Sequence, residues 1–266
     1  MKYPWETPLF APLWKTPPHP VPLGPEDVHV WSLCLEAEPM LMERAARLLS
    51  PAEQRHAMTL CSDLQCKRYI AAHSQLRMIL GSYTGHAPQE LRFTQGRGGK
   101  PGLARSCGTE NLCFSLAHCG ELGLLAVSRH PETGADLERV RPLKHIPMLS
   151  AQFFSAREKR HWEHLHPRLQ ARRFLQLWTQ KQALLKAVGQ RSAPRPQSVE
   201  LSLRTSRETR VLSIKGRREE AATWGVRLLI PALDFIAAVA VHSPRFRLHC
   251  WHWPEEVAFE RRSWPN

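Results

Sequence analysis

The sequence predicts an α+β protein made of two related halves. A helical apolar pattern that ends at Gly81 is similar to a second one that ends at Gly189, and each is followed by a pair of strand-like runs. The spacing of about 108 residues is much longer than the ~20–50 residues of solenoid repeats. We therefore expect residues 28–133 and residues 134–245 to form two similar α+β units.

Local signals define the elements of the first half. Ser50-Pro51-Ala52-Glu53 has the residues of a helix start, with a capping serine, a proline in the first turn and a glutamate at the third position. A longer helix is expected from Gln65 to Leu80, and it should stop at Gly81. The other elements expected here are a helix over residues 39–49 and strands at Val28–Leu33, Leu91–Phe93, Leu112–Leu116 and Leu122–Val127.

The two ends of the chain differ in composition from the body. Residues 1–27 are rich in proline, which predicts an extended or polyproline-like arm. Residues 246–266 form an aromatic tail, which we expect to pack back onto the body. The side chains expected to hold these two segments in place are Trp5, Phe10 and Trp14 in the arm and Trp251, Trp253 and Trp264 in the tail.

The composition limits the kinds of partner and compartment. Lys and Arg number 37 against 24 Asp and Glu, which gives a formal net charge of +13 and a pI near 9.9. This excess indicates an anionic partner, which can be nucleic acid, a phosphorylated cofactor or an acidic protein. The seven cysteines include no C-x-x-C pair, which favours a reducing compartment over a disulfide framework or zinc site. Without a signal pattern or an apolar run of ~18 residues, we expect a cytoplasmic protein with no membrane segment.

Two acidic residues stand out at the start of the second half. Asp136 and Glu138 follow a turn-like segment, and in an extended strand residues i and i+2 lie on the same face. Two neighbouring carboxylates repel each other unless a cation lies between them or one is protonated. Mg²⁺ prefers oxygen ligands of this kind. Taken alone, such a pair is more often a solvated strand end than a metal site.

A helix about forty residues further on can face this pair. Its apolar spacing runs from Arg172 to Val188 and ends at Gly189. Trp178, Gln182 and Lys186 are four residues apart, so they form one row along the helix. The row can bring an amide and an ammonium group to the acidic pair.

Together these motifs resemble those of the surfactin-type 4′-phosphopantetheinyl transferases, whose hallmarks are G-[IV]-D-[IVL]-E and W-x-x-K-E-[AS]-x-x-K. Gly134–Glu138 matches the first hallmark and Trp178–Lys186 matches the second. Two positions depart: Ala135 replaces a larger aliphatic residue, and Gln182 replaces the family's glutamate. Between the hallmarks, the family's F-[FS]-x-x-E is matched by Phe154, Ser155 and Glu158.

The resemblance extends to two segments of the first half. Gly99-Lys100-Pro101 matches the family's G-K-P, and Phe114–His118 matches F-N-[ILV]-S-H, with Ala117 in place of the serine. Without the resemblance, the glycine-rich segment Gly96–Pro101 is predicted to be a hairpin turn, and His118 an ordinary turn histidine. A phosphate-binding P-loop is excluded because Lys100 is followed by proline.

The resemblance implies an activity and a site. It implies two halves related by a pseudo-twofold axis with the active site in the cleft between them, and Mg²⁺ held by Asp136, Glu138 and Gln182 beside the coenzyme A pyrophosphate. A carrier-protein serine would attack the β-phosphorus and release adenosine 3′,5′-bisphosphate. The implied catalytic residues are Gln182, Lys186 and Glu138, and the implied coenzyme-binding residues are Arg68, Gly99, Lys100, Ser115, Ala117, His118 and Lys186.

The implied partner is an acidic acyl, peptidyl or aryl carrier protein that meets a monomer of this chain. The segment from Ser155 to Arg173 is rich in Lys and Arg and borders the carrier groove in the family, although such a run is usually a solvated helix face. No membrane or nucleic-acid partner is expected. His161, His164 and His166 have no spacing that supports a metal site.

Two other functions remain open from the sequence. Gln182 cannot accept a proton, so the chain can be a catalytically impaired homologue that still binds coenzyme A and a carrier protein. A basic chain with a D-x-E pair also fits a metal-dependent nuclease, although neither a further acidic ligand nor a nucleic-acid-binding motif is recognised.

Overall fold

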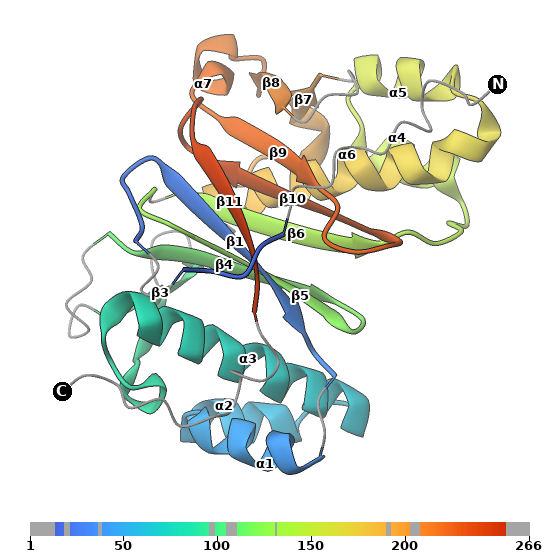
Figure 1. Ribbon diagram of the computed structural model, residues 1–266. Coiled ribbons are helices and arrows are strands. Elements are labelled where there is room, and N and C mark those ends of the chain that lie inside the picture. The colour runs from blue at the N-terminus through green and yellow to red at the C-terminus, as the bar shows by residue number, and fades with distance from the viewer. Residues whose placement is uncertain are drawn as a thin grey trace.

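A computed structural model shows the fold (Figure 1). It describes residues 14–18, 22–36, 39–95, 99–104, 111–130, 132–189, 193–202 and 208–253. These residues form the predicted α+β fold, in which two larger sheets and one short hairpin pack with helices. Within this part of the chain, no helix is long and apolar enough to cross a membrane, and no disulfide joins the six described cysteines.

The first larger sheet belongs mainly to the N-terminal half. Its strand order is β11-β1-β5-β4, in which β1 pairs antiparallel with β5 and parallel with β11. The strands are β1 (Asp27–Cys34), β4 (Cys113–Cys119), β5 (Leu122–Ser128) and β11 (Arg247–His252). The helices and short elements of this half are α1 (Pro39–Leu48), α2 (Pro51–Met58), α3 (Asp63–Thr84), the 3₁₀ turn η1 (Pro88–Glu90) and the hairpin of β2 (Phe93–Gln95) with β3 (Pro101–Leu103).

The second larger sheet belongs to the C-terminal half. Its order is β6-β10-β9-β8-β7, and every described pair in it is antiparallel. The strands are β6 (Thr133–Arg139), β7 (Val199–Leu201), β8 (Glu208–Ile214), β9 (Gly225–Leu229) and β10 (Phe235–Val241). The helices are α4 (Ile146–Phe153), α5 (Ala156–Glu163), α6 (Pro167–Val188), α7 (Arg218–Ala222) and the 3₁₀ turn η4 (Pro196–Ser198).

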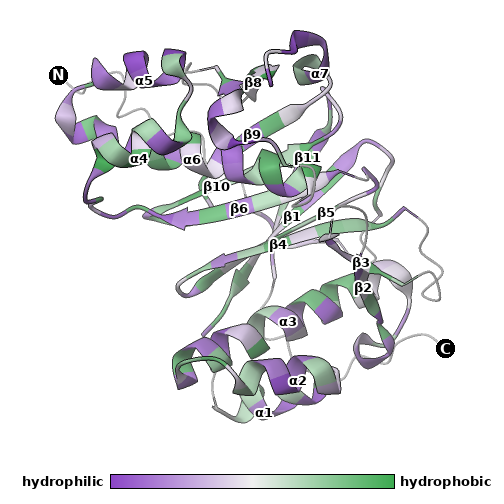
Figure 2. Cartoon of the chain, turned by 180° about the vertical axis from the view of Figure 1, so that it is seen from behind, coloured by the Kyte–Doolittle hydropathy of each residue, from purple (hydrophilic) through white to green (hydrophobic). Residues whose placement is uncertain are grey.

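The two sheets lie face to face between α1–α3 on one side and α6 on the other (Figure 1). Strand alternation produces this layering, because successive side chains point to opposite faces. In β1, Trp31 packs against α3, whereas Val30 packs in the apolar layer between the sheets. In β6, Ala135 and Leu137 enter that same layer. Figure 2 shows hydrophobic residues along the inner strands and hydrophilic residues on the outer turns of α2 and α5.

The helix start at Ser50 is confirmed, but the expected end of the long helix is wrong. Ser50 and Glu53 form a complete capping box at the start of α2. The helix α3 passes through Gly81 and ends at Thr84, where Gly85 adopts the left-handed conformation. A glycine inside a helix costs only about 1 kcal/mol. The last turn offsets this cost, since Tyr83 accepts a hydrogen bond from Trp31 Nε1 at 3.0 Å.

Two strands also differ from the expectation. The strand expected from Leu91 to Phe93 begins only at Phe93. The Leu91 carbonyl accepts a hydrogen bond from buried Arg77 and not from a neighbouring strand. The strand expected to end at Leu116 continues to Cys119, so His118 lies on β4 and not in a turn. The predicted hairpin is present as paired β2 and β3, while residues 96–98 lie outside the described residues.

Both ends of the described chain pack onto the body, as predicted. Trp14 Nε1 donates to the Ile230 carbonyl at 3.3 Å, and Lys15 pairs with Trp251. Residues 247–252, which we expected in a tail, form β11 of the first sheet. Trp5, Phe10 and Trp264 lie outside the described residues.

Each half contains a buried ion pair that joins its long helix to a capping-box glutamate. In the first half, Arg77 Nη2 of α3 lies 2.6 Å from Glu53 Oε2, and the same guanidinium donates to the carbonyls of Pro88 and Leu91. In the second half, Lys181 Nζ of α6 lies 2.5 Å from Glu158 Oε2, and both side chains are fully buried.

The carbonyl partners of Lys181 complete the correspondence between the halves. Its ammonium donates to Phe153, Pro196 and Val199. In each half, therefore, a cation on the long helix binds a capping glutamate and the carbonyls of a Pro-Gln 3₁₀ turn. This shared arrangement supports the internal repeat inferred from the sequence. It also shows that Ser155 and Glu158, which match F-[FS]-x-x-E, have a structural role.

We predict that Lys181→Ala lowers the free energy of unfolding by about 3–5 kcal/mol, because it leaves the Glu158 carboxylate buried without its cation. The matched control is Lys159→Ala, which removes an exposed pair with Glu163 at 3.8 Å and should cost at most ~1 kcal/mol. Urea unfolding of the three proteins measures both values. If both variants lose the same small amount of unfolding free energy, the buried pair does not stabilise the fold as we infer.

Candidate active site

The site begins where β6 crosses α6 at very short range. A Cβ atom placed on Gly134 would lie 2.1 Å from the Ala183 carbonyl oxygen and 2.4 Å from the Ala187 amide nitrogen, both in the backbone of α6. No side chain fits there, so the glycine is needed for the close approach of strand and helix and not for an unusual backbone angle. The side chains of Asp136 and Glu138, on the same face of β6, are thereby held against α6.

Asp136 is buried at this contact, and its charge is only partly compensated. Its Oδ1 atom lies 2.6 Å from Lys186 Nζ, while its Oδ2 atom is buried with no hydrogen-bond partner among the described residues. Burial raises the pKa of Asp136 to about 6, and the nearby Glu138 carboxylate adds to the rise, whereas Lys186 opposes it. An unpaired buried carboxylate oxygen is costly, which makes this the natural place for a cation.

Glu138 is held by the other end of the predicted row on α6. Trp178 Nε1 donates to Glu138 Oε1 at 2.9 Å, and the indole packs edge-on against Phe153 with ring centroids 4.3 Å apart. Since Trp178 contacts Glu138 and Lys186 contacts Asp136, the half-buried Gln182 between them on the helix lies opposite the acidic pair. The predicted contacts of Trp178 and Lys186 with the two acids are therefore present, and Gln182 lies between these two residues along the helix.

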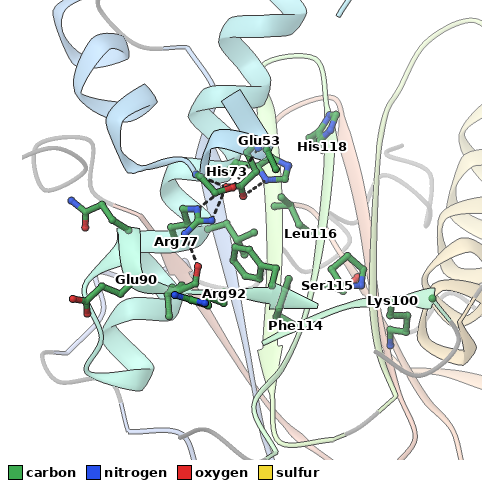
Figure 3. A pocket seen from close by; sticks show the side chains of 18 of the residues that line it. Glu53, His73, Arg77, Glu90, Arg92, Lys100, Phe114, Ser115, Leu116 and His118 are labelled. Atoms are coloured by element: carbon green, nitrogen blue, oxygen red, sulfur yellow. Dashed lines mark hydrogen bonds and ion pairs between the residues drawn. The ribbon is translucent and has the colours of Figure 1, made fainter. Parts of the chain in front are cut away.

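A pocket of about 1110 Å³ opens beside this contact and is lined from both halves. Its walls come from α2, α3, η1, the β2–β3 hairpin and β4, and Lys186 reaches it from α6. Figure 3 shows Lys100 and Ser115 on one side and the Glu53, His73 and Arg77 group on the other. Lys186 is thus the residue shared by the pocket and the acidic pair.

The pocket brings together five of the seven residues predicted to bind coenzyme A: Gly99, Lys100, Ser115, His118 and Lys186. Ala117 is not among them. It is buried in the apolar layer between the sheets, on the face of β4 opposite His118. Ser115 shares this face, and its hydroxyl accepts a hydrogen bond from the Ala135 amide at 3.0 Å. Arg68 does not line the pocket either, and its guanidinium lies 3.1 Å from the exposed Glu36 carboxylate.

Lys100 links the hairpin of the first half to the β6–α6 contact by hydrogen bonds. Its Nζ atom donates to the Thr133 carbonyl at 2.7 Å and to the Ala187 carbonyl at 3.1 Å. Burial lowers the pKa of this amine. The pKa of His118 is also lowered, first by partial desolvation in the pocket and then by the positive charges of His73 and Lys186.

Sequence reasoning missed several residues of the pocket wall. His73 and Arg77 are one turn apart on α3, and both contact Glu53, at 3.4 and 2.6 Å respectively. Arg92 lies at the wall near η1 (Figure 3). The capping-box glutamate and the i, i+4 spacing of the two basic residues were visible in the sequence, but nothing there indicated that they face a shared cavity.

The basic segment between residues 155 and 173 is an exposed surface of α5 and the start of α6. Two of its basic side chains take part in ion pairs, Arg157 with Glu200 at 3.3 Å and Lys159 with Glu163 at 3.8 Å. Its exposed arginines are Arg157, Arg160, Arg168 and Arg172. The segment therefore offers positive charge to the solvent.

Comparison with known proteins agrees with this arrangement. Residues 132–240, which contain β6, α6 and the acidic pair, match the 4′-phosphopantetheinyl transferase superfamily. The chain is 29% identical over 240 residues to the 4′-phosphopantetheinyl transferase HetI of Nostoc sp., which covers 90% of this chain and 98% of the relative. A putative 4′-phosphopantetheinyl transferase of Synechocystis sp. is 33% identical over 160 residues, or 60% of this chain and 64% of that protein.

A third relative matches a shorter part. The 4′-phosphopantetheinyl transferase AcpT of Escherichia coli strain K12 is 34% identical over 94 residues, which is 35% of this chain and 47% of that protein. The match to the 4′-phosphopantetheinyl transferase superfamily thus covers residues 132–240, and the likeness to the Nostoc protein extends over most of the chain.

Proposed function

We propose that this chain is a Mg²⁺-dependent 4′-phosphopantetheinyl transferase of the surfactin type, which moves the phosphopantetheine arm of coenzyme A to a carrier-protein serine. The observation that carries the proposal is the contact of Asp136 with Lys186 and of Glu138 with Trp178, beside a pocket that Lys186 lines together with residues of the first half. The superfamily match over the same residues supports it.

The residues present fit a bound Mg²⁺ ion. The buried Oδ2 atom of Asp136 has no partner among the described residues, and Glu138 offers a second carboxylate from the same face of β6. The amide oxygen of Gln182 would be the third protein ligand, and oxygen-only ligation suits Mg²⁺. When bound, the ion would neutralise charge on the coenzyme A pyrophosphate.

The pocket residues have complementary roles in this proposal. Lys186 and Lys100 would bind the pyrophosphate oxygens as fixed cations, and His118 would donate a hydrogen bond to a phosphate of the nucleotide. Ser115, whose oxygen accepts from the Ala135 amide, would keep its hydroxyl proton for the coenzyme. Such preorganised donors stabilise the charge that develops in the transition state. The apolar wall of the pocket, which includes Leu91, Phe93, Phe114 and Leu116, offers surface to the uncharged parts of the coenzyme.

The proposed reaction is a substitution at the β-phosphorus. The serine oxygen of the carrier forms the new P–O bond, the pyrophosphate P–O bond breaks, and adenosine 3′,5′-bisphosphate leaves. Glu138, oriented by the Trp178 indole, accepts the serine proton either directly or through one water. Because Gln182 cannot accept a proton, this role falls on the acids of β6.

An acidic carrier protein is the proposed partner. The exposed arginines of α5 and the start of α6 lie in the same half as the acidic pair. Complementary charge would speed the encounter and fix its orientation more than it would add affinity. We propose that one monomer of this chain meets one carrier at a time.

One observation favours a second candidate, a homologue that binds coenzyme A and a carrier but transfers slowly. The row on α6 has a neutral amide at position 182, opposite the acidic pair. A nuclease has less support, because no third carboxylate, histidine or cysteine of the described residues joins Asp136 and Glu138 in a metal-binding cluster.

Intact-mass measurement of an apo carrier protein tests the proposal. The carrier is incubated with this chain, coenzyme A and Mg²⁺, and modification adds one phosphopantetheine arm of ~340 Da. The expected result is this gain with Mg²⁺ and none with EDTA. A carrier whose mass stays unchanged in every carrier class tried, while coenzyme A binds, would favour the second candidate.

We predict that Gln182→Glu tightens the apparent affinity for Mg²⁺ and raises kcat at least ~10-fold, a figure below the ~10²–10⁴-fold of a positioned general base. The substitution restores a negative charge and a proton acceptor at nearly the same shape. A Mg²⁺ titration of carrier modification, at matched coenzyme concentration, compares the variant with the parent. Equal rates at every Mg²⁺ concentration would remove Gln182 from the metal site.

A further inference from the structure

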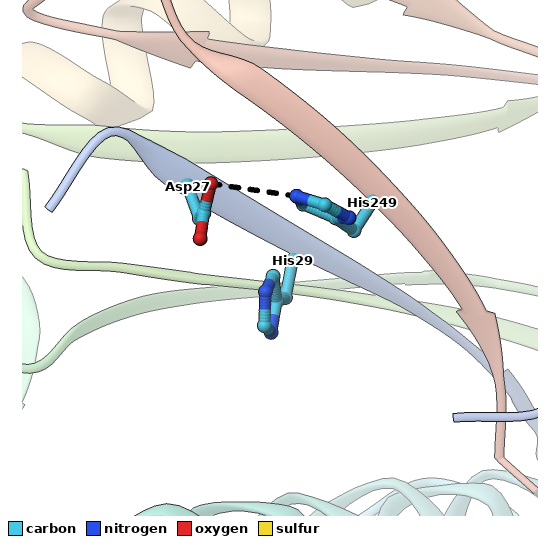
Figure 4. Close-up of side chains that lie close together, drawn as sticks. All are labelled: Asp27, His29 and His249. Carbon is cyan, nitrogen blue, oxygen red and sulfur yellow. Dashed lines mark hydrogen bonds and ion pairs between the residues drawn. The ribbon is translucent and has the colours of Figure 1, made fainter. Parts of the chain in front are cut away.

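A second group of chemically active side chains lies at the start of β1, away from the pocket residues. In the parallel pair of β1 and β11, Asp27 is opposite Arg247 and His29 is opposite His249. Alternate residues of neighbouring strands share a face, so Asp27, His29 and His249 gather on one side of the sheet (Figure 4). None of these residues lines the pocket.

The spacing of these three side chains is close to that of a metal site. One potential ligand atom from each lies within 4.8 Å of the other two, and His249 Nε2 is 3.4 Å from Asp27 Oδ1. Ligands with Zn–N and Zn–O bonds of 2.0–2.2 Å at tetrahedral angles are about 3.4 Å apart. The His249–Asp27 separation already has that value, and the half-exposed His249 ring has room to rotate toward His29.

Neighbouring groups are placed to orient these ligands. His29 is buried, and its Nδ1 atom lies 2.7 Å from the Tyr83 hydroxyl, while Trp31 Nε1 donates to the same oxygen. If His29 carries its proton on Nδ1 and donates it to Tyr83, the Nε2 lone pair is available to an ion. Asp27 Oδ2 accepts a hydrogen bond from the Gly24 amide at 2.8 Å. Such outer partners accompany most histidine and carboxylate ligands.

Arg247 supplies the positive charge beside Asp27 in this structure. Its Nε atom lies 2.8 Å from Asp27 Oδ1, and 64% of its side chain is exposed. A metal ion at the site would have to displace this guanidinium, which can turn into the solvent. The same contact explains how the carboxylate is satisfied without an ion.

We propose that Asp27, His29 and His249 form a binding site for a divalent transition-metal ion of the zinc type, with water in the remaining position. Two imidazoles and one carboxylate suit Zn²⁺ and its neighbours in the first transition row, whereas Mg²⁺ prefers oxygen ligands alone. The bound ion would join β11, near the C-terminal end of the described chain, to β1 of the first half.

Isothermal titration of the metal-free chain with Zn²⁺ tests this proposal. The protein carries no added histidine tag and is freed of metal with a chelator. The parent should bind one Zn²⁺ ion. His249→Ala should weaken binding at least ~10-fold, because the loss of a direct ligand lowers metal affinity no less than the loss of an outer-shell partner does. His164→Ala, which removes an exposed histidine, is the matched control and should bind as the parent does.

Arg247→Gln gives the sharper result, since removing the competing guanidinium should tighten Zn²⁺ binding. Asp136→Ala should leave it unchanged, which separates this site from the proposed Mg²⁺ site and makes the result independent of the transferase activity. The melting temperature should rise with Zn²⁺ in the parent and in Arg247→Gln but not in His249→Ala. Absence of binding would overturn the proposal. Binding that neither His249→Ala nor Arg247→Gln alters would show an adventitious ion only.

Discussion

The arrangement of the candidate site depends on how closely one strand approaches one helix. At Gly134 the backbone of β6 lies against the backbone of α6 with no room for a methyl group. This contact brings the acids of β6 within hydrogen-bond distance of a row of side chains on α6, so that Asp136 meets Lys186 and Glu138 meets Trp178. A wider spacing, as in ordinary helix-on-sheet packing, would leave both acids without these partners.

This contact has an energetic cost, and other parts of the fold offset it. Burying Asp136 with one unpartnered oxygen raises its pKa to about 6, which means that folding disfavours the ionised form. The helix that faces it is anchored by the buried pair of Lys181 with Glu158. Lys100 adds a third support, because it binds carbonyls of β6 and α6 from the hairpin of the other half. Strand, helix and hairpin are thus fixed at the place where the proposed chemistry needs them.

Sequence reasoning predicted the local parts of this arrangement well. The strand with its two acids, the row on α6 and the capping box at Ser50 each depend on residues within a few positions, and regular periodicity exposes them. Features that depend on distant residues were missed. The end of α3 depends on contacts of Tyr83 with β1, and the burial of Ala117 depends on the second sheet. The pairing of β11 with β1 joins opposite ends of the chain, which no local pattern can indicate.

The most direct test of this account is the rate of carrier modification by Gly134→Ala. The added methyl group must move strand and helix apart by roughly 1 Å, since 2.1 Å is far below the 3.0 Å that real Cβ contacts exceed. A misplacement of that size can cost ~10²-fold in rate, so we expect a loss of that order in a protein that still folds. Gly102→Ala, whose Cβ would meet nothing within 4 Å, should keep the parent rate. A folded Gly134→Ala protein that transfers as fast as the parent would contradict the claim that this contact positions the catalytic acids.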